Sequence, residues 1–563
     1  MTNQEQSDKY GIQYMTAPDS TREWLTQEPL TQPPIWCSVD LRDGNQALAT
    51  PMSLKEKLRF FKLLVTLGFK EIEIGFPAAN DTEYTFCRKL IEDDLIPDDV
   101  TVQVLTQARA HIIEKTFEAI EGAKNVIVHL YTPTSVAHRE QVFHMTQEET
   151  LALAVHGAKI CEAARLASSD PNAIRFEFSP EGFSATEPDF ALSVCQAVCD
   201  VWHPTKAHPV IVNLPATVEV SLPHIYANQV AYLRKQLTPA EGIVLSVHPH
   251  NDRGCAVASA EYSLMAGADR VEGTLFGNGE RTGNVDLITL ALNFYSQGIH
   301  PNLDFSRLSE VTGLFESLTG MPIYERQPYS GQLVYAAFSG SHQDAIAKSF
   351  AYRKANPSHM WDVPYLPVDP SDFGREYETD VIRINSQSGK GGIVYVLHSQ
   401  YGLDLPREMH LYFSQMIKMY SDRLKTELQS SQVYDIFLGE LVNLSAPLTL
   451  LSAHYQQNSG IEAEIRFQFC GEEQTASGIG NGRLDAVSNA LKQALHISYT
   501  LNTYTEHALA DGSGAKAVSY VELRQGKRTE WGVGLHTDIV TSSVYALVSA
   551  INRLLQCDDN HFL

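Results

Sequence analysis

Two histidines, His248 and His250, carry the strongest chemical signal in the sequence. They stand at the end of a short apolar run, in the segment Val247–Asp252, and side chains two positions apart point to the same side of a strand. Imidazoles that end an apolar strand are costly to bury unless they are paired or bound to an ion. We therefore expect them to bind a metal ion, and a hydrogen-bonded structural pair is the alternative.

The segment Asp40–Gln46 places a second set of polar side chains at the end of another apolar run. Asp43 is the expected third ligand, because two imidazoles and one carboxylate with open positions suit a catalytic divalent ion. Asp40 is expected to be buried in the strand or behind the ligands. Arg42 offers a planar fork to a carboxylate or a developing oxyanion, and a structural ion pair is the alternative.

Further polar residues follow other apolar runs. The glycine-rich segment Gly273–Asn284 is a weak signal alone, since glycine loops often merely turn the chain, but Asn284 offers a side-chain oxygen to the same metal. Three more runs end in polar side chains, and these are His129 with Tyr131, Ser179 with Glu181, and Thr217. Polar groups at so many run ends are hard to explain by packing, so together they favour one site.

These polar segments belong to a regular alternation that starts at residue 35. Short β-rich runs alternate with amphipathic segments such as Ser53–Gly68, where Ser53 and Glu56 form a capping box, and this pattern predicts a parallel sheet. Eight units fit a closed (β/α)8 TIM barrel better than an open sheet, and no G-x-G-x-x-G motif follows the first strand. The expected strands are Ile35–Leu41, Glu71–Phe76, Thr101–Leu105, Asn125–Tyr131, Arg175–Phe178, Pro209–Leu214, Gly242–Val247 and Arg270–Leu275.

The barrel accounts for the positions of the expected ligands. In such barrels the chemistry lies where strands end and loops begin, and a glycine-rich loop after the eighth strand is a common phosphate position. The first and seventh strands are near neighbours in a closed barrel of eight. Asp43 can therefore approach His248 and His250.

The remaining sequence predicts three further regions around a barrel over residues 31–300. Residues 1–30 are polar and are expected to form an irregular arm, and residues 301–430 a linker with helices near Ser306–Leu318 and Glu408–Leu428. Residues 431–563 predict an α/β domain in which three strands and a helix occur twice. Its expected elements are Leu448–Tyr455, Glu462–Phe469, Gln474–Ser477 and helix Gly482–Leu495, then His496–His507, Ala517–Arg524, Glu530–His536 and helix Asp538–Leu555.

The composition excludes several classes of protein. Hydrophobic residues make up 44% and charged residues 20%, which is typical of a folded globular chain. The net charge of -24 argues against nucleic acid as a partner. The chain has no apolar run of about 18 residues and no secretory signal at its start, so we expect no membrane association and a cytoplasmic location. The 8 scattered cysteines suit reduced thiols.

Taken together, the motifs resemble those of the metal-dependent acyl-CoA/2-oxo-acid Claisen condensing barrel enzymes. The likeness is closest to the long-type 2-isopropylmalate synthases of that family and covers essentially residues 30–555. The motifs that carry it are Trp36–Gln46, Glu73–Pro77, His248–Asp252 and Gly277–Asn284 in the barrel, and Ser341–Ala345, Val363–Pro367 and Asn385–Gly392 after it.

The resemblance implies a reaction and its cofactors. Acetyl-CoA would lose a methyl proton, its enolate would attack the ketone of 2-oxoisovalerate, and hydrolysis of the thioester would release 2-isopropylmalate and CoA. This is the first committed step of leucine biosynthesis. A divalent metal such as Mg, Mn or Zn would act as a Lewis acid, and a monovalent cation such as K is a further candidate.

The resemblance also implies roles for single residues. Asp43, His248 and His250 would be the metal ligands, Asn284 a weaker one, and Arg42 would stabilise oxyanion charge. The oxo-acid pocket would consist of His129, Ser179, Glu181 and Thr217, with Leu105 and Tyr131 as apolar walls. His342 and Tyr365 match residues that the family's linker is thought to bring over the active site of the partner subunit. The proton-abstracting base stays open between Glu181 and a water assisted by His342.

Residues 431–563 resemble the family's allosteric domain, which binds leucine between the subunits of a homodimer. The region carries no catalytic motif of its own, and a domain for dimerisation alone is the alternative. The residues that match the leucine pocket are Gly480, Gly482, Leu484, Tyr504, Ala508 and Ala515.

Three alternative functions fit less well. Homocitrate or citramalate synthase would need a different acceptor, and the 2-oxoglutarate of the former needs a cation where Leu105 and Tyr131 are expected. Metal-dependent amidohydrolase barrels place their H-x-H motif on the first strand rather than the seventh. A sensor that has lost catalytic activity would not be expected to keep the full set of metal ligands.

Overall fold

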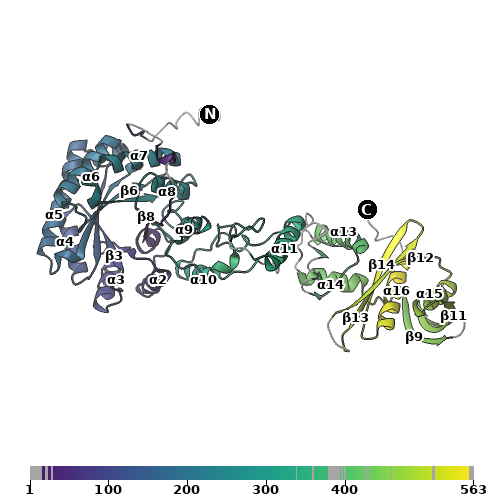
Figure 1. Cartoon of the computed structure of the whole chain (residues 1–563). Coiled ribbons are helices and arrows are strands. Elements are labelled where there is room, and N and C mark those ends of the chain that lie inside the picture. The colour runs from purple at the N-terminus through teal and green to yellow at the C-terminus, as the bar shows by residue number, and fades with distance from the viewer. Residues whose placement is uncertain are drawn as a thin grey trace, which may run out of the picture. The chain divides into compact units, whose positions relative to one another are not determined.

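The N-terminal region folds as a closed barrel of eight parallel strands that follow one another in chain order (Figure 1). The computed structural model describes residues 15–18, 23–26, 30–337, 339–357, 360–377, 393–394, 397–398, 401–424, 428, 430–457, 460–509 and 514–556. The barrel strands are β1 (Ile35–Ser38), β2 (Glu71–Gly75), β3 (Thr101–Gln107), β4 (Val126–Pro133), β5 (Ile174–Glu181), β6 (Val210–Ala216), β7 (Ile243–Pro249) and β8 (Arg270–Gly273). The predicted TIM barrel is confirmed, and each predicted run overlaps a strand, although the bounds differ by up to three residues, as where β1 ends at Ser38 and Asp40–Gly44 form a helical turn.

Helices connect the barrel strands and surround them (Figure 1). They are α2 (Leu54–Leu67), α3 (Asp81–Glu92), α4 (Ala110–Ile120), α5 (Gln147–Ala167), α6 (Pro188–Trp202), α7 (Pro223–Gln236), α8 (Ala256–Met265) and α9 (Leu287–Ser296), followed by α10 (Leu308–Thr319). The predicted capping box is present at the start of α2, where Ser53 and Glu56 bond to each other's backbone N–H groups. Gly68, at φ 99°, ends the helix.

Short helical turns lie in the connections. They are η1 (Glu23–Thr26), η2 (Asp40–Gly44), η3 (His138–Phe143), η4 (Pro171–Ala173), η5 (Phe183–Ala185), η6 (Ala240–Gly242), η7 (Leu275–Gly277) and η8 (Pro370–Phe373). The turn η2 follows β1 directly and carries Arg42 and Asp43. As predicted, Asp40 is buried, and its carboxylate accepts hydrogen bonds from Ser38 and from the backbone of Leu275.

The barrel interior contains a layer of buried polar side chains. Glu73, Gln103, Glu177, Asn213, Arg270 and Glu272 are each at most 1% exposed. The Arg270 guanidinium donates to Glu71 at 2.6 Å, to Gln103 at 2.7 Å and to Glu272 at 3.0 Å. Buried charges are tolerated only when they are paired and hydrogen-bonded, so this layer fixes the orientation of its members.

The chain divides into two compact units. One unit comprises Met1–Val334 with Asp369–Arg375 and contains the barrel, and the other comprises Tyr335–Val368 with Glu376–Leu563. The predicted boundaries at residues 30, 300 and 430 stay predictions. Among the residues that the structure describes, no helix has both the length and the hydrophobicity needed to cross a membrane.

The C-terminal unit contains two antiparallel sheets of three strands, each followed by a helix. The first consists of β9 (Leu448–Gln457), β10 (Ile461–Phe469) and β11 (Glu472–Gly480) and is followed by α15 (Arg483–Ala494). The second consists of β12 (Thr500–Ala508), β13 (Ala517–Gln525) and β14 (Arg528–His536) and is followed by α16 (Ile539–Leu555). The predicted repeat of three strands and a helix is confirmed.

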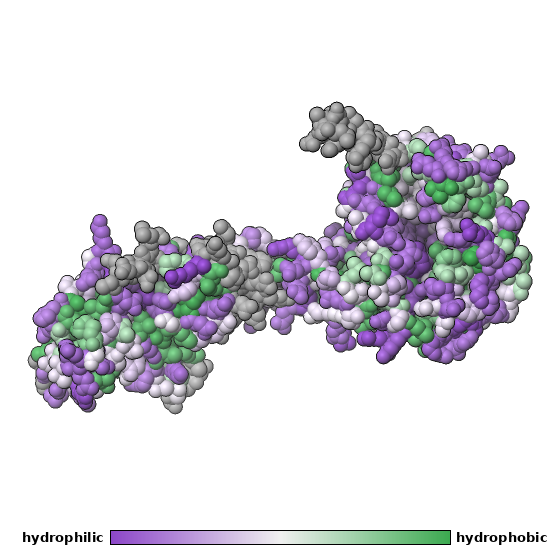
Figure 2. All heavy atoms as spheres, turned by 180° about the vertical axis from the view of Figure 1, so that it is seen from behind, coloured by the Kyte–Doolittle hydropathy of each residue, from purple (hydrophilic) through white to green (hydrophobic). Residues whose placement is uncertain are grey.

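The described part of this unit also contains the helices α11 (Gly340–Ala355), α13 (Arg407–Leu424) and α14 (Ser430–Leu441). Phe413 of α13 and Phe437 of α14 meet edge to face, and they share one apolar core with Trp531 of β14. Hydrophobic patches interrupt the surface of the C-terminal unit on the face shown in Figure 2. The motif Asn385–Gly392 lies outside the described residues.

Candidate active site

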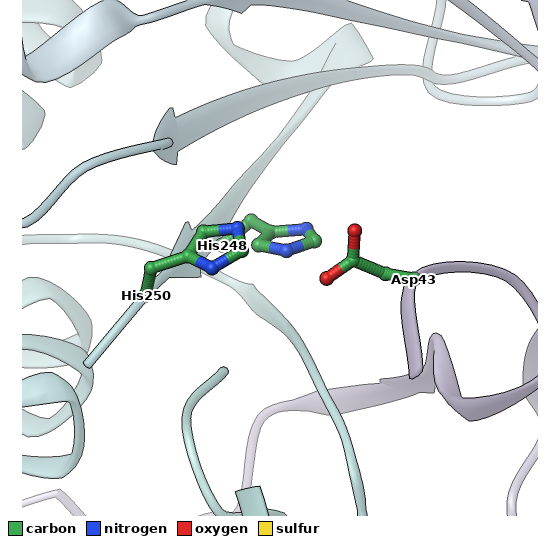
Figure 3. A group of neighbouring side chains, drawn as sticks. All are labelled: Asp43, His248 and His250. Atoms are coloured by element: carbon green, nitrogen blue, oxygen red, sulfur yellow. The ribbon is translucent and has the colours of Figure 1, made fainter. Parts of the chain in front are cut away.

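Three polar side chains converge at the carboxyl end of the barrel (Figure 3). His248 lies in β7, His250 follows the last residue of β7, and Asp43 lies in η2 after β1. One ligand atom from each lies within 4.8 Å of the other two, and all three residues are buried. In Figure 3 the carboxylate of Asp43 points toward the His248 ring, and the His250 ring lies on the other side of His248. The structure thus brings the three predicted metal ligands together.

The protonation states of this group suit a cation. Burial and the neighbouring His248 lower the pKa of His250 to about 4, so its ring is neutral at physiological pH. The buried Nδ1 of His250 has no hydrogen-bond partner among the described residues. Burial alone would raise the pKa of Asp43, but Arg42 and the two imidazoles lower it, so the carboxylate is ionised. An open imidazole nitrogen beside an ionised carboxylate fits a divalent ion.

Asn284 lies between two members of this group. Its Nδ2 donates to Oδ2 of Asp43 at 2.6 Å, and its Oδ1 lies 2.7 Å from Nε2 of His248. The structure therefore places Asn284 beside the stronger ligands, as expected, while its own role as a ligand stays a prediction.

The Arg42 side chain is held on two sides. Its Nε donates to Oε2 of Glu73 at 2.6 Å, and its Nη1 donates to Oδ1 of Asp43 at 2.8 Å. Nη2 contacts no acceptor within the described part of the chain, which leaves it available to a substrate oxygen. Arg42 thus forms the ion pairs that the sequence left as the alternative, and its role toward an oxyanion stays a prediction.

From Glu73 the contacts continue into the predicted oxo-acid pocket. Oε1 of Glu73 lies 2.9 Å from Nδ1 of His129, and Nε2 of His129 lies 2.7 Å from Oγ of Ser179. Burial would raise the pKa of Glu73, but Arg42 and His129 lower it, so the carboxylate is an anion between them. The Glu73 carboxylate therefore orients both the Arg42 guanidinium, beside the predicted metal ligands, and the His129 imidazole in the predicted pocket.

Asn213 and Glu272 close these contacts into a ring. Nδ2 of Asn213 donates to Oγ of Ser179 and to Oε2 of Glu272, each at 3.0 Å. Oε2 of Glu272 lies 2.8 Å from Nδ1 of His248. Asn284 contacts both His248 and Asp43, which completes the ring. We call the whole set the polar ring, and its members are Asp43, Arg42, Glu73, His129, Ser179, Asn213, Glu272, His248 and Asn284.

Gln103 of β3 spans the polar ring. Its Nε2 donates to Oε1 of Glu272 at 2.8 Å and to Oε1 of Glu73 at 3.2 Å. With this residue, each barrel strand or the segment that directly follows it contributes to one hydrogen-bonded network. Because buried networks of this kind have few alternative arrangements, the metal ligands and the oxo-acid pocket are positioned together.

A cavity of about 260 Å³ opens above the polar ring. It is lined by the three predicted metal ligands and by every residue predicted for the oxo-acid pocket, namely Leu105, His129, Tyr131, Ser179, Glu181 and Thr217. The Tyr131 hydroxyl accepts a hydrogen bond from Gln107 at 2.7 Å, which fixes the ring as a wall. The cavity also contacts Glu280 and Arg281 from the glycine-rich segment.

Glu181 stands at the end of β5, on the wall of this cavity. Burial raises its pKa, and His138 and Arg42 offset that rise only in part. Its carboxylate accepts no hydrogen bond from the residues that the structure describes. The backbone N–H of Gly182 donates to Oγ1 of Thr217 at 2.9 Å, which fixes the chain next to Glu181. A carboxylate with a raised pKa and a free oxygen is suited to take a proton.

A second cavity, of about 770 Å³, shares Arg42 and Gln46 with the first. Its other walls include Met52 and Leu54 from the start of α2, and Asn80 and Thr82 from the start of α3. Two helix N-termini thus border a larger space beside the reacting groups, and such termini favour anionic groups.

The two predicted residues of the linker lie in the C-terminal unit. The rings of His342 and Tyr365 stack with their centroids 3.9 Å apart and their planes inclined by 22°. Tyr365 adopts a positive φ of 66° and is largely exposed. The structure therefore pairs these residues with each other, and their role over an active site stays a prediction.

The residues predicted for leucine are distributed over both repeats of the C-terminal unit. Gly480 ends β11, Gly482 and Leu484 stand at the start of α15, Tyr504 and Ala508 lie in β12, and Ala515 precedes β13. The Tyr504 hydroxyl lies 2.8 Å from Oγ of Ser543, near the start of α16. Ala508 pairs with Ala517, whose partner His536 ends the strand before α16. Most of this set therefore lies around the starts of the two helices.

Four buried residues of the site were not predicted, namely Glu73, Gln103, Asn213 and Glu272. Each of them connects the predicted metal ligands to the predicted pocket. The signal was present, because these are single polar residues within apolar strands, as in Ile72-Glu73-Ile74 and Val212-Asn213-Leu214. A polar side chain at an inward position of a barrel strand is costly unless it is paired, so each indicated a buried partner.

Three family models match successive parts of this chain. Residues 33–314 match the HMGL-like family, residues 332–398 the family described as alpha-isopropylmalate synthase, post-catalytic domain-like, and residues 427–555 the LeuA allosteric (dimerisation) domain. The 2-isopropylmalate synthase of Helicobacter hepaticus is 54% identical over 556 residues, which cover 97% of this chain and 99% of that protein. The 2-isopropylmalate synthase of Desulfitobacterium hafniense is 54% identical over 550 residues, covering 98% of each.

Proposed function

The chain belongs to the 2-isopropylmalate synthase family, and on that premise we propose how its residues carry out the reaction. It is an acyltransferase of leucine biosynthesis. The proposed reaction joins the methyl carbon of acetyl-CoA to the ketone carbon of 2-oxoisovalerate, and water then cleaves the thioester to give 2-isopropylmalate and CoA. The observation that carries this assignment is the cavity in which the metal ligands, Arg42 and the apolar walls Leu105 and Tyr131 meet.

Asp43, His248 and His250 hold the divalent ion, with Asn284 as a weaker ligand. When bound, the ion polarises the ketone of the 2-oxo acid and neutralises its carboxylate. Two observations support this assignment. The Nδ1 of His250 has no hydrogen-bond partner among the described residues, and the carboxylate of Asp43 is ionised. The preferred metal is Mg, Mn or Zn, and a monovalent cation such as K is a further cofactor to test.

Arg42 stabilises the negative charge that develops on oxygen. Its Nε and Nη1 are bonded to Glu73 and Asp43, so the guanidinium stays in place while Nη2 contacts the substrate. Donors fixed before the reaction are effective because they need no reorganisation as charge develops.

Glu181 is the group that removes the methyl proton of acetyl-CoA. Its raised pKa lies closer to working pH than that of an ordinary carboxylate, and its carboxylate lines the cavity with no hydrogen-bond donor among the described residues. His129, Ser179 and Thr217 position the oxo acid beside it. A water assisted by His342 is the alternative base, with Tyr365 stacked on that imidazole.

The second cavity receives acetyl-CoA. It adjoins the reacting groups through Arg42 and Gln46, is large enough for an extended ligand, and is bordered by the starts of α2 and α3. A thioester that enters from this side reaches Arg42 with its acyl end first.

The C-terminal domain assembles a homodimer and binds leucine as an allosteric inhibitor. Exposed apolar side chains on its strands and helices support an association surface, and among them are Leu451, Ile479, Leu501 and Ile539. The N-terminal ends of α15 and α16 lie beside the predicted leucine residues and suit the carboxylate of an amino acid. A domain for dimerisation alone is the alternative, and residues 431–563 are the proposed extent of this region.

The function is tested by measuring CoA release from acetyl-CoA with a panel of 2-oxo acids, in the presence of Mg, Mn or Zn. We expect the highest kcat/KM with 2-oxoisovalerate and no release after complete metal removal. A higher kcat/KM with 2-oxoglutarate or pyruvate would support a homocitrate or citramalate synthase instead.

A further inference from the structure

Glu272 lies fully buried in β8, below the metal ligands, and accepts hydrogen bonds from four side chains. Gln103 and Arg270 donate to its Oε1 at 2.8 Å and 3.0 Å. Asn213 donates to its Oε2 at 3.0 Å, and Nδ1 of His248 lies 2.8 Å from the same oxygen. A carboxylate offers about four acceptor positions, so all of them are used and the group is held in one orientation.

The donors around Glu272 establish it as an acceptor. Arg270, Gln103 and Asn213 all approach it with N–H groups, and the Arg270 guanidinium supplies the opposite charge at 3.0 Å. An imidazole nitrogen next to this carboxylate must therefore carry a proton, because two acceptors in contact would repel each other.

This contact determines which nitrogen of His248 faces the site. With Nδ1 directed to Glu272, the other nitrogen, Nε2, lies on the side of Asp43 and Asn284. Rotation of the ring by half a turn would break the bond to Glu272 and place a carbon where Nε2 now lies beside Asn284. His250 differs, because its Nδ1 has no partner among the described residues.

We propose that Glu272 is a positioning residue for the divalent ion, whose carboxylate fixes the ring orientation and the tautomer of His248. The inference rests on the proposed function of His248 as a ligand. Carboxylates that accept a hydrogen bond from a metal-binding histidine commonly raise metal affinity by about 10–100-fold. Glu272 also accepts a hydrogen bond from Asn213, which donates to Ser179. The same carboxylate therefore contacts both the proposed ligand His248 and a residue that positions the proposed oxo-acid pocket.

The test is the affinity of the metal-free, full-length protein for Mn²⁺, measured by calorimetry in the absence of substrates. We expect Glu272→Gln to weaken binding by about 10–100-fold, because the amide cannot serve four donors, and Glu272→Asp to restore part of the loss. Glu71→Gln is the matched control. Glu71 is also buried and accepts a hydrogen bond from Arg270 at 2.6 Å, but it has no contact with His248 among the described residues.

The outcomes separate this inference from the proposed metal site. If His248→Ala binds Mn²⁺ as tightly as the wild type, the ligand assignment itself fails. If His248→Ala loses binding while a folded Glu272→Gln keeps wild-type affinity, the site stands and the role of Glu272 is refuted. An equal loss in Glu71→Gln would also refute it, because the effect would then come from the buried layer in general.

A measurement on the wild type covers the case in which Glu272→Gln does not fold. Nitrogen-15 labelling of histidine reports which ring nitrogen carries a proton in the metal-loaded protein. We expect His248, identified by the signal missing from His248→Ala, to carry its proton on Nδ1 in a strong hydrogen bond. A proton-free Nδ1 at His248 would overturn the proposal.

Discussion

The imidazole rings of His248 and His250 lie nearly parallel, with centroids 5.2 Å apart, yet their pKa values are shifted in opposite directions. Burial would lower the pKa of both. At His248 the hydrogen bond and charge of Glu272 outweigh burial and raise the pKa. At His250 burial and the neighbouring His248 outweigh the charge of Asp43, and the pKa falls to about 4. The neutral His250 is therefore ready to bind a cation, whereas His248 must first release a proton.

This difference predicts how metal affinity depends on pH. As pH falls below the raised pKa of His248, its ring becomes protonated and competes with the cation, so affinity for Mn²⁺ should decrease. His250 should add no further dependence until about pH 4. Calorimetric titrations between about pH 5.5 and 8.5 check this. An affinity that stays constant over that range would contradict the assignment of His248 as a ligand.

Removal of a metal ligand should abolish catalysis without unfolding the barrel. We expect His248→Ala and His250→Ala to lose turnover while keeping a cooperative thermal transition, because both residues end a strand rather than fill the apolar core. Asp43→Asn should also lose activity, with some metal still bound. CoA release and bound metal are measured together, and His156→Ala, at an exposed position of α5, is the control. A variant that retained its rate with a chelator present would disprove the ligand set.

The walls of the cavity predict the choice of acceptor. Leu105 and Tyr131 give methyl groups an apolar surface worth about 1–3 kcal/mol, so 2-oxoisovalerate should exceed pyruvate in kcat/KM by about 10–100-fold. The second carboxylate of 2-oxoglutarate would be desolvated there without a partner. Leu105→Ala should reduce the preference over pyruvate, which competition between the two acids measures. A preference that does not change in this variant would place the isopropyl group elsewhere.

The base can be identified from the pH dependence of the rate. If Glu181 takes the methyl proton, it must be ionised, and kcat should fall as pH decreases through its raised pKa. Glu181→Gln should lower kcat by about 10²–10⁴-fold and remove that acidic limb. The parallel variant His342→Ala tests the alternative. A Glu181→Gln enzyme with near wild-type kcat, beside an inactive His342→Ala, would assign the proton transfer to the water assisted by His342.

Tyr504 offers the sharpest test of regulation by leucine. Its hydroxyl bonds to Ser543 near the start of α16, so Tyr504→Ala should weaken leucine binding and remove inhibition without changing the uninhibited rate. The expected coupling between the two sites is about 1–3 kcal/mol. Thr505→Ala is the matched control, because Thr505 is exposed on the same strand and points to the opposite face. Equal inhibition of Tyr504→Ala and wild type, with calorimetry showing unchanged leucine binding, would contradict the pocket assignment.

The elements of the fold were predictable because their signals are local. Alternating strands and helices, the capping box at Ser53 and the repeat of three strands and a helix can all be recognised within short windows. The helix α11 was missed because its apolar residues do not gather on one face, so the sequence shows no helical stripe. The strand β5 extends to Glu181, beyond the predicted Phe178, because its pairing with β4 continues as far as Glu181, which lies opposite Pro133.

The polar ring could not be predicted as a connected network. Asn284 and Asp43, which bond at 2.6 Å, are separated by 241 positions, and Gln103 and Glu272 by 169. Which of several inward polar side chains meet depends on the register and tilt of the closed barrel. The predicted ligands were found because His248, His250 and Asp43 stand at strand ends, where the fold itself brings them together.

Leu105 and Tyr131 line the cavity but lie outside the polar ring. Their substitution changes the shape offered to the acceptor while leaving every bond among the ring's members in place. The proposed choice of the acceptor's side chain can thus vary while the polar ring, which includes His129 and Ser179 of the predicted pocket, stays in place. Descendants of such a protein can acquire a new acceptor through changes at one or two wall positions, without first passing through an inactive intermediate.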